Sequence, residues 1–295
     1  MRSLPRAAQT LADELIERCS AEPTRGVSFQ GAPGANSHQA VVEAFPDAIP
    51  LPCFSFEDAL DAVREGKASR AMIPIENSNH GRVTDLHVLL PECELSIAGE
   101  FFLRVRHCLV GTGTLDDITE ATSHPQALGQ CRRWLRARGI TPILNADTAG
   151  AAAEVAEIGD PKVAAISSKL AAELYGLNVL AMGIEDDPSN TTRFVILTTD
   201  PPSNVFLPNS IVSLFFETKN APAALYKALG SFATRGVNLT KLESYQRESG
   251  SSISRFYAEV AHGTDEANVA AAIDELRFHC TMVKVLGCYE QAWRP

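Results

Sequence analysis

The stretch VSFQGAPGANSHQAVVEAFPDAIPLPCFSFEDALDAVREGKASRAMIPIE (27–76) alternates short β-rich runs with helical patterns. VSFQ, IPLPCF and AMIPIE have the composition of buried strands, and the segments between them carry apolar residues at helical spacing. A further helical pattern, VTDLHVLL (83–90), follows the third run. Such alternation is typical of βαβ units, so the sequence predicts an α/β fold with a mostly parallel sheet.

A second α/β group follows the first. It contains the β-rich runs RHCLVG (106–111), TPILNA (141–146), KVAAIS (162–167) and NVLAMGI (178–184), with helical patterns such as HPQALGQCRRWLRARG (124–139) between them. The long extended passage SIAGEFFLRVRHCLVG (96–111) suits a crossing from one lobe to another. We therefore predict two lobes, with RFVILTT (193–199) returning to the first and a ligand cleft between them.

The Pro- and Asn-rich stretch DPPSNVFLPN (200–209) is typical of a linker. Strand and helix patterns beyond it follow the order βαββαβ, which is that of a ferredoxin-like module. The predicted domains are an extension over 1–25, a two-lobed region over 26–203 and a module over 204–295. Leu11, Leu15 and Ile16 share a helical stripe in the extension, which predicts a short amphipathic helix.

Composition excludes several classes of function. The chain has 295 residues and a formal net charge of -10, which argues against a nucleic-acid partner. Its seven cysteines are scattered without metal-ligand spacing, and no apolar run is long enough to span a membrane, so we expect a reduced, cytoplasmic protein. A basic run within 132–138 is interpreted as the solvated face of one helix rather than as a separate anion site.

Two motifs in the first lobe place polar residues next to a strand. QGAPGANSH (30–38) joins a strand to a helix, and Asn36 and Ser37 could cap that helix beside an anion; a tight βα turn is the plainer interpretation. IPIENSNHGRV (73–83) ends a buried strand in Glu76 and Asn77, which would point into the crevice or cap the strand. Spacing alone leaves both pairs of alternatives open.

Two further motifs lie in the second half of this region. In SHPQALGQC (123–131), Ser123 and Gln126 fit a capping box, and Gln130 lies one turn further along the same face. In IEDDPSNTTRFVIL (184–197), Arg193 could clamp a carboxylate, although local spacing favours a salt bridge to Asp186 or Asp187. No nucleotide, zinc or nicotinamide motif is present, so we expect no cofactor and no metal.

Five separated segments, taken in order, resemble the prephenate dehydratase family. They are GAPGANSHQA (31–40), IPIENSNHGRV (73–83), SHPQALGQC (123–131), AAISSKLAAELYGLNVLAMGIEDDPSNTTRFVIL (164–197) and the ESYQ-bearing (243–246) C-terminal module. The resemblance runs from about Val27 to the C-terminus. It implies a two-lobed, periplasmic-binding-protein-like catalytic region fused to an ACT regulatory domain.

The resemblance also implies a reaction, in which prephenate loses CO2 and water to give phenylpyruvate. The Thr of the family's T-R-F triplet, here Thr192, is the implied proton donor. Asn77, Ser123 and Gln130 match the other catalytic positions. Positions expected to bind the substrate are Arg193, Phe194, Glu76 and Ser37.

Phenylalanine is the effector that the resemblance implies, bound at a subunit interface of a homodimer or homotetramer. The matching positions are Ala223, Ala224, Leu225, Asn238, Glu243 and Ser244. Two departures weaken this match: Ala223 replaces a glycine, and Tyr245 and Gln246 replace Arg and Pro. The alternatives are an arogenate dehydratase and a non-catalytic two-lobed binding protein joined to an amino-acid sensor.

Overall fold

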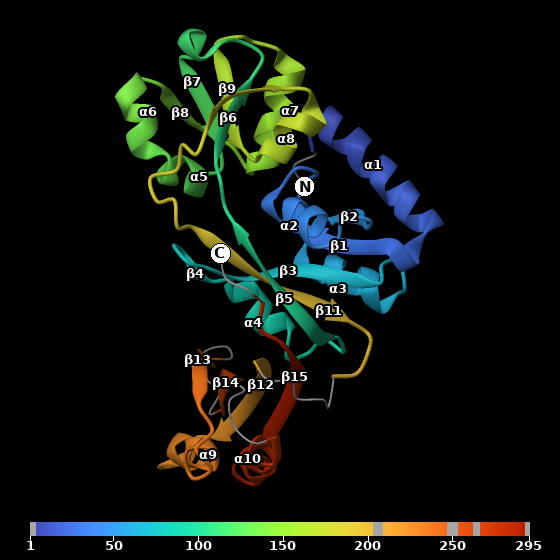
Figure 1. Ribbon diagram of the computed structural model, residues 1–295, viewed down its shortest axis with the longest axis vertical. Coiled ribbons are helices and arrows are strands. Elements are labelled where there is room, and N and C mark those ends of the chain that lie inside the picture. Colours follow the sequence, from blue (N-terminus) through green and yellow to red (C-terminus); the bar gives the residue numbers. More distant parts are fainter. Residues whose placement is uncertain (1–3, 203–208, 247–252, 262–265, 293–295) are drawn as a thin grey trace. The chain divides into compact units, whose positions relative to one another are not determined.

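The computed structural model describes residues 4–202, 209–246, 253–261 and 266–292, and these form three β-sheets with flanking helices (Figure 1). Among them, no helix is both long and apolar enough to cross a lipid bilayer. Contacts divide the chain into two compact units, Met1–Arg82 with Phe101–Phe194 and Val83–Glu100 with Val195–Arg294. Each unit is described by itself, and strands β5 and β11 contain residues of both.

The first sheet contains the strands that the opening stretch predicts. Its order is β2 (Ile49–Cys53), β1 (Gly26–Gln30), β3 (Arg70–Asn77), β11 (Thr191–Thr198) and β5 (Ser96–Arg104), with β4 (Gly81–Arg82) paired to β3. β1 runs parallel to β2 and β3, as βαβ units require. The crossover helices are α2 (Asn36–Ala44) and α3 (Phe56–Arg64). β11 thus returns to the first lobe, as predicted.

The second sheet has the order β10 (Asn178–Met182), β6 (Cys108–Gly111), β9 (Val163–Ser167), β7 (Glu120–Ser123) and β8 (Thr141–Leu144). β7 is parallel to β8 and β9, whereas β6 is antiparallel to β9 and β10. The sequence did not predict β7, whose residues EATS lack the large apolar side chains of the other strands. β8 lies at the edge of this sheet.

Four helices cover the two faces of the second sheet, in pairs (Figure 1). α5 (Pro125–Gln130) and α6 (Arg132–Arg138) pack against one apolar core, and α7 (Thr148–Ile158) and α8 (Lys169–Tyr175) pack against another. The single helical pattern over 124–139 is therefore two helices. The break comes at the buried Cys131, and the carboxylate of Asp186 accepts from the Arg133 N–H at the start of α6.

The N-terminal extension folds as helix α1 (Arg6–Ala21), which confirms the predicted helix. α1 packs against β2 of the first lobe and α7 of the second, and the Glu157 carboxylate accepts from the Ala7 N–H at 2.6 Å. The predicted stripe was wrong at Ile16, which is exposed, because Ala8, Ala12, Leu15 and Cys19 form the buried face. α1 therefore holds both lobes of the first unit.

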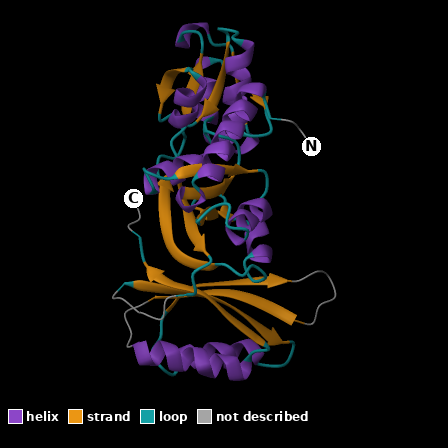
Figure 2. Ribbon diagram, turned by 90° about the vertical axis from the view of Figure 1, so that its right-hand side faces the viewer, coloured by secondary structure: helices purple, strands orange, loops and turns teal. Residues whose placement is uncertain are grey.

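The C-terminal residues form a four-stranded antiparallel sheet in the predicted βαββαβ order. Its elements are β12 (Ser210–Lys219), α9 (Ala224–Ala233), β13 (Leu239–Gln246), β14 (Ile253–Ala261), α10 (Glu266–His279) and β15 (Met282–Glu290). The strand order is β13-β14-β12-β15, and both helices cover one face of the sheet (Figure 2). Phe216, Phe232 and Leu276 lie in the core between them.

A short segment from within the predicted two-lobed region (26–203) belongs to this second unit. It comprises helix α4 (Thr84–Leu89) and the first part of β5. The Lys284 ammonium on β15 donates to the backbone oxygens of Pro91, at 3.1 Å, and Cys93. A side chain at Gly287 would overlap the Ile97 carbonyl, so glycine permits this close packing.

Ala223 has a left-handed backbone, with φ of 60°, just before α9. An L-residue with a Cβ is disfavoured there by about 1 kcal/mol, so Ala223→Gly should raise the free energy of unfolding by about that amount. Urea unfolding measures the change. The matched Ala224→Gly variant changes a residue with helical geometry and should instead lose about 0.5 to 1 kcal/mol. A destabilised Ala223→Gly protein would contradict the assignment of backbone strain to position 223.

Candidate functional site

The end of β3 is held against the start of β11 by two hydrogen bonds. The Ser78 N–H donates to the Thr191 carbonyl at 2.9 Å, and the Thr191 N–H donates to the Ser78 hydroxyl at 3.0 Å. Asn77 and Thr192, which are 115 positions apart in the chain, therefore become neighbours. Two of the four predicted catalytic residues meet at this point.

The Asn77 side chain is fixed in orientation by contacts on both ends of its amide. Its Nδ2 donates to the Thr192 hydroxyl at 2.9 Å and to Asn190 Oδ1 at 2.8 Å. Its Oδ1 accepts from the backbone N–H groups of Asn79 and His80. Because the Thr192 oxygen accepts from Asn77, the hydroxyl hydrogen of Thr192 can be donated elsewhere.

Asn190 connects this pair to the second lobe. It is only 1% exposed, and its Nδ2 donates to Gln130 Oε1 at 2.6 Å. The same Gln130 oxygen lies 3.0 Å from Nε2 of His107, a residue between β5 and β6. A continuous chain of hydrogen bonds thus joins Thr192, Asn77, Asn190, Gln130 and His107. We call these five residues the polar cluster.

His107 is buried, and its environment determines its protonation. Burial lowers the pKa of His107 below its usual value, while the hydrogen bond to Gln130 and the charge of Glu185 act in the opposite direction. The imidazole is therefore neutral at pH 7. Since the Gln130 oxygen is an acceptor, Nε2 of His107 carries the hydrogen. His107 orients Gln130 as a neutral donor.

The loop before β11 is shaped by its own acidic residues. Asp187 Oδ1 accepts from both the N–H and the hydroxyl of Ser189, at 2.9 and 2.6 Å. The Asp186 carboxylate accepts from the Arg133 N–H at the start of α6. No ion pair joins Arg193 to Asp186 or Asp187 in the described part of the chain, so the predicted salt bridge was wrong. Arg193 is nearly buried, and its guanidinium lies 5.9 Å from the ring centroid of Phe102.

Ser123 lies apart from the hydrogen bonds of the polar cluster. Its hydroxyl is fully buried and donates to the Ile166 carbonyl at 2.6 Å. The predicted capping box was wrong, because His124 is the N-cap of α5 and its Nδ1 accepts from the Gln126 N–H. This geometry favours a structural role for Ser123, and its catalytic role stays a prediction.

Ser123→Ala should lower the free energy of unfolding by about 1 kcal/mol, the usual loss for one buried hydrogen bond. Turnover per folded molecule should change less than threefold if the hydroxyl serves only the Ile166 carbonyl. Thermal melting and an activity assay on the same preparation measure both quantities. A turnover loss of about a hundredfold without a change in melting would instead place Ser123 in catalysis.

The turn between β1 and α2 is built around Gly34 and His38. Gly34 has a φ of +89°, and a side chain there would approach Ala171 to 2.9 Å. Its N–H donates to Nδ1 of His38, whose ring stacks on Phe29. The predicted capping by Asn36 or Ser37 was wrong: the N-cap is Ala35, without a side-chain cap. His38 is buried and serves packing in this turn.

Burial lowers the pKa of His38 to about 4. In the unfolded chain the ring takes up a proton near pH 6.5, so stability is lost as the pH falls from 6.5 towards 4. At pH 5 the wild type should lose about 2 kcal/mol more, relative to pH 7.5, than His38→Asn, whose Oδ1 can replace Nδ1 as an acceptor. Urea unfolding at both pH values measures this. Equal losses in the two proteins would contradict the neutral, buried imidazole.

The four positions expected to bind the substrate have different environments. Glu76 faces Arg82 across the β3–β4 pair, and Ser37 is buried in the first turn of α2. Phe194 is 1% exposed, which favours packing over contact with a ligand, and Arg193 is described above. No hydrogen bond links Ser37 or Phe194 to the polar cluster in the described part of the chain. Substrate contacts at these positions stay predictions.

The predicted effector residues lie at the start of helix α9, just before strand β13 and on β13. Ala223, Ala224 and Leu225 surround the start of α9, whereas Glu243 and Ser244 belong to the edge strand β13. The Asn238 carbonyl accepts from the Ala261 N–H at 3.1 Å. The Tyr245 hydroxyl, at a position that departs from the family pattern, donates to the Glu243 carboxylate.

Sequence reasoning missed two members of the polar cluster, Asn190 and His107. Asn190 directly precedes the T-T-R-F run, so its position next to Thr192 was a usable signal. His107 lies within the extended passage over 96–111, with no local motif around it. Its role becomes visible only through the contact with Gln130, 23 positions away.

The polar cluster combines one hydroxyl, three amides and one neutral imidazole. It can grip hydroxyl and carboxylate groups and direct one O–H donor at them, but it contains no charged acid and no activated nucleophile. This chemistry suits a reaction that needs orientation and one proton. The fold and the cluster together define a two-lobed α/β protein in which hydrogen bonds join polar residues of both lobes.

Comparison with known proteins identifies the family. The sequence profile of prephenate dehydratase matches residues 27–202, more than half of the chain. This chain belongs to the prephenate dehydratase family.

Individual relatives carry several named activities. The chain is 44% identical to a bifunctional N-acyl-homoserine lactone acylase/prephenate dehydratase of Komagataeibacter europaeus, over 90% of this chain and 95% of the relative. It is 37% identical to arogenate dehydratase/prephenate dehydratase 1 of Arabidopsis thaliana, over 89% of this chain and 71% of the relative. A solved prephenate dehydratase of Arthrobacter aurescens in complex with L-Phe is 32% identical, with a TM-score of 0.81 over 90% of each chain.

Proposed function

We propose that the chain catalyses the decarboxylative dehydration of prephenate to phenylpyruvate, a step in phenylalanine biosynthesis. One observation carries the proposal. The Thr192 hydroxyl is held by Asn77 at 2.9 Å and is connected through Asn190 to Gln130, so residues from distant segments form one polar centre. Family membership supplies the substrate class.

The reaction requires little covalent help from the protein. The electron pair of the bond to the ring carboxylate moves into the ring as CO2 leaves, and the C4 hydroxyl departs with a proton as water. Aromatisation drives the step. A hydroxide is a poor leaving group, so a positioned O–H donor at Thr192 lowers the barrier. Asn77 would position the Thr192 hydroxyl, because both of its N–H hydrogens are already donated within the protein, and Gln130 would hold the departing oxygen or a carboxylate in place.

Charge on the substrate suggests tasks for the remaining predicted residues. Prephenate carries two carboxylates, and Arg193 next to Thr192 would balance one of them. The N–H groups at the start of α2, around Ser37, would favour another. Glu76 and Phe194 would contact the substrate from β3 and β11.

Regulation by phenylalanine is part of the proposal. The βαββαβ module over 204–295 would be an ACT domain, with phenylalanine between β13 and the start of α9 of paired subunits in a dimer or tetramer. The Arthrobacter aurescens relative, which was solved in complex with L-Phe, supports this assignment. Turnover should fall as phenylalanine is added. A flat response up to millimolar concentrations would remove the regulatory assignment and leave the catalytic one intact.

Three alternatives to prephenate dehydration can be tested in the same experiment. Relatives named arogenate dehydratases make arogenate a second substrate to assay. The relative named a bifunctional acylase makes an N-acyl-homoserine lactone another compound to assay. Among the side chains that the structure describes, no His ring is hydrogen-bonded to a Ser, Thr or Cys, which argues against a His-activated nucleophile for that reaction. A pure binding protein would bind prephenate without releasing CO2.

The deciding experiment incubates the purified, metal-free protein with prephenate and follows phenylpyruvate absorbance and CO2. Parallel reactions contain arogenate or an N-acyl-homoserine lactone. We expect turnover on prephenate that exceeds turnover on the other two compounds. Faster turnover on arogenate would reassign the substrate, and ligand binding without CO2 release would refute the enzyme.

A further inference from the structure

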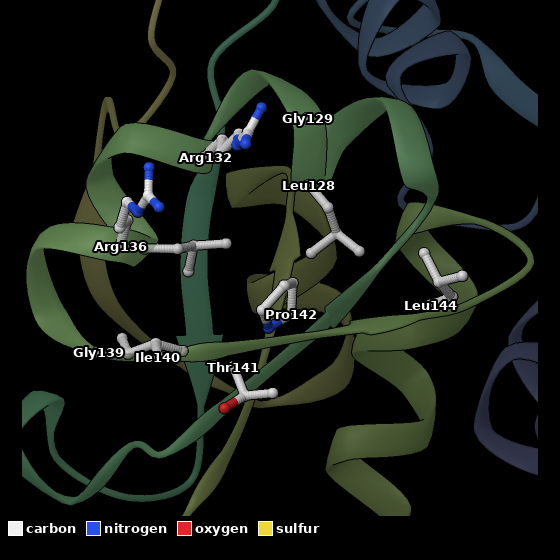
Figure 3. Close-up of a pocket in the computed structure, with 10 residues that line it drawn as sticks. Leu128, Gly129, Arg132, Arg136, Gly139, Ile140, Thr141, Pro142 and Leu144 are labelled. Carbon is white, nitrogen blue, oxygen red and sulfur yellow. The ribbon is translucent and has the colours of Figure 1, made fainter.

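A groove on the second lobe is not explained by the proposed reaction. It lies between helices α5 and α6 and the edge strand β8, and encloses about 550 Å³ (Figure 3). This volume is in the usual range for small-molecule sites. Leu128 and Gly129 of α5 line the groove, whereas Gln130, the next residue, points its amide at the polar cluster. None of the five cluster residues lines the groove.

The walls of the groove are mainly apolar. Leu128, Leu135 and Ile140 belong to the core between α5, α6 and the second sheet, and the groove reaches their outer surfaces. Pro142 and Leu144 of β8 close the other side, and Leu144 is 73% exposed. Covering such a leucine removes apolar surface from water and is favourable by about 25 cal/mol for each Å². A suitable occupant therefore has an apolar body.

Two arginines line one edge of the groove. Arg132 and Arg136 are four positions apart on α6, and Figure 3 shows both side chains projecting from that helix. Neither guanidinium has an ion pair or a hydrogen bond with any residue in the described part of the chain. In a protein with a net charge of -10, this is a local concentration of uncompensated positive charge. This positive charge favours the binding of an anion.

The other two arginines of this run behave differently. Arg138 stacks its guanidinium on the Trp134 ring at 3.9 Å, and neither Arg133 nor Arg138 lines the groove. The sequence predicts one solvated face for the arginines within 132–138. In the structure, Arg132 and Arg136 line the groove, and Arg133 and Arg138 do not. Only the Arg132 and Arg136 pair combines free guanidinium groups with an apolar wall.

We propose that this groove is a second ligand site, which binds a small amphipathic carboxylate. The apolar body would lie against Leu128, Pro142 and Leu144, and the carboxylate would accept hydrogen bonds from Arg132 and Arg136. Guanidinium groups match the planar geometry of a carboxylate better than ammonium groups do. A nucleic acid is unsuited as an occupant, because the rest of the chain is acidic.

The test uses octanoate as the probe and calorimetry on the full chain. Octanoate should bind at least about tenfold more tightly than octanamide, which has the same chain without the charge, and its affinity should fall with added salt. The double variant Arg132→Gln/Arg136→Gln should weaken octanoate binding by about tenfold or more. Leu144→Gln, at an exposed position, should also weaken it.

The matched control is Arg133→Gln/Arg138→Gln, which removes the same number of charges from the same helix. It should bind octanoate within about threefold of the wild type. If both double variants lose the same octanoate affinity, the effect comes from the net charge of the protein, and the proposed site is refuted. Octanoate binding that survives all the groove variants would place the probe elsewhere, with the same consequence. A change of subunit number in Leu144→Gln, measured by light scattering, would mark the groove as a subunit interface and refute the ligand site.

Discussion

Replacing Thr192 by valine is expected to lower the turnover of prephenate by about two to four orders of magnitude. Valine keeps the shape of threonine but removes the hydroxyl that Asn77 holds at 2.9 Å. Without that donor, the C4 oxygen must leave with a proton taken from water. Turnover number and Michaelis constant measured on the purified variant separate loss of chemistry from loss of binding.

The matched control at this position is Thr192→Ser, which keeps the hydroxyl and the acceptor for Asn77. It should retain turnover within about tenfold of the wild type, because a serine hydroxyl can take the same rotamer at some entropic cost. Near wild-type turnover in Thr192→Val would remove Thr192 from the mechanism. An equal loss in the serine and valine variants would assign the effect to packing.

Asn190→Leu is expected to have the second largest effect, a loss of about a hundredfold in turnover. Asn190 contacts Asn77 at 2.8 Å and Gln130 at 2.6 Å, and it is buried. Leucine leaves both amides without that partner, so each can rotate away from the substrate. The same change should lower the free energy of unfolding by about 1 to 3 kcal/mol, because buried polar groups lose their hydrogen bonds.

Two further variants separate positioning from general destabilisation. Asn190→Asp has nearly the same shape but faces the Gln130 oxygen with an acceptor, so its turnover should fall at neutral pH and recover partly at low pH as the carboxyl takes up a proton. If Asn190 acts through Thr192, adding Asn190→Leu to Thr192→Val should cost little beyond the valine change alone. Fully multiplicative losses would show that Asn190 acts independently of Thr192.

The fold was largely predictable because its strands are short apolar runs separated by helical patterns. The failures have tertiary causes. β7 spans Glu120–Ser123, whose sequence EATS has no large apolar or β-rich run to mark it as a strand. Cys131 breaks a continuous helical pattern while Asp186, which lies far along the chain, caps the second half. The grouping of α4 with the C-terminal strands depends on Lys284 reaching backbone oxygens more than 190 positions away.

The site was predictable where a motif carries the residue and unpredictable where only a contact does. Asn77, Gln130 and Thr192 were identified through the family resemblance, and the structure brings them together. Ser123 matches the same motifs, yet its hydroxyl is directed at Ile166. Asn190 and His107 were missed because burial and long-range hydrogen bonds give them their roles. No local spacing encodes those properties.

The most direct test is a crystal structure of the Thr192→Val protein with prephenate bound, since this variant should hold the substrate while converting it slowly. We predict that the C4 oxygen of prephenate lies within about 4 Å of the side chain at position 192 and that Gln130 hydrogen-bonds the substrate. Prephenate bound away from residues 77, 130 and 192 would contradict the assignment of the polar cluster as the active site.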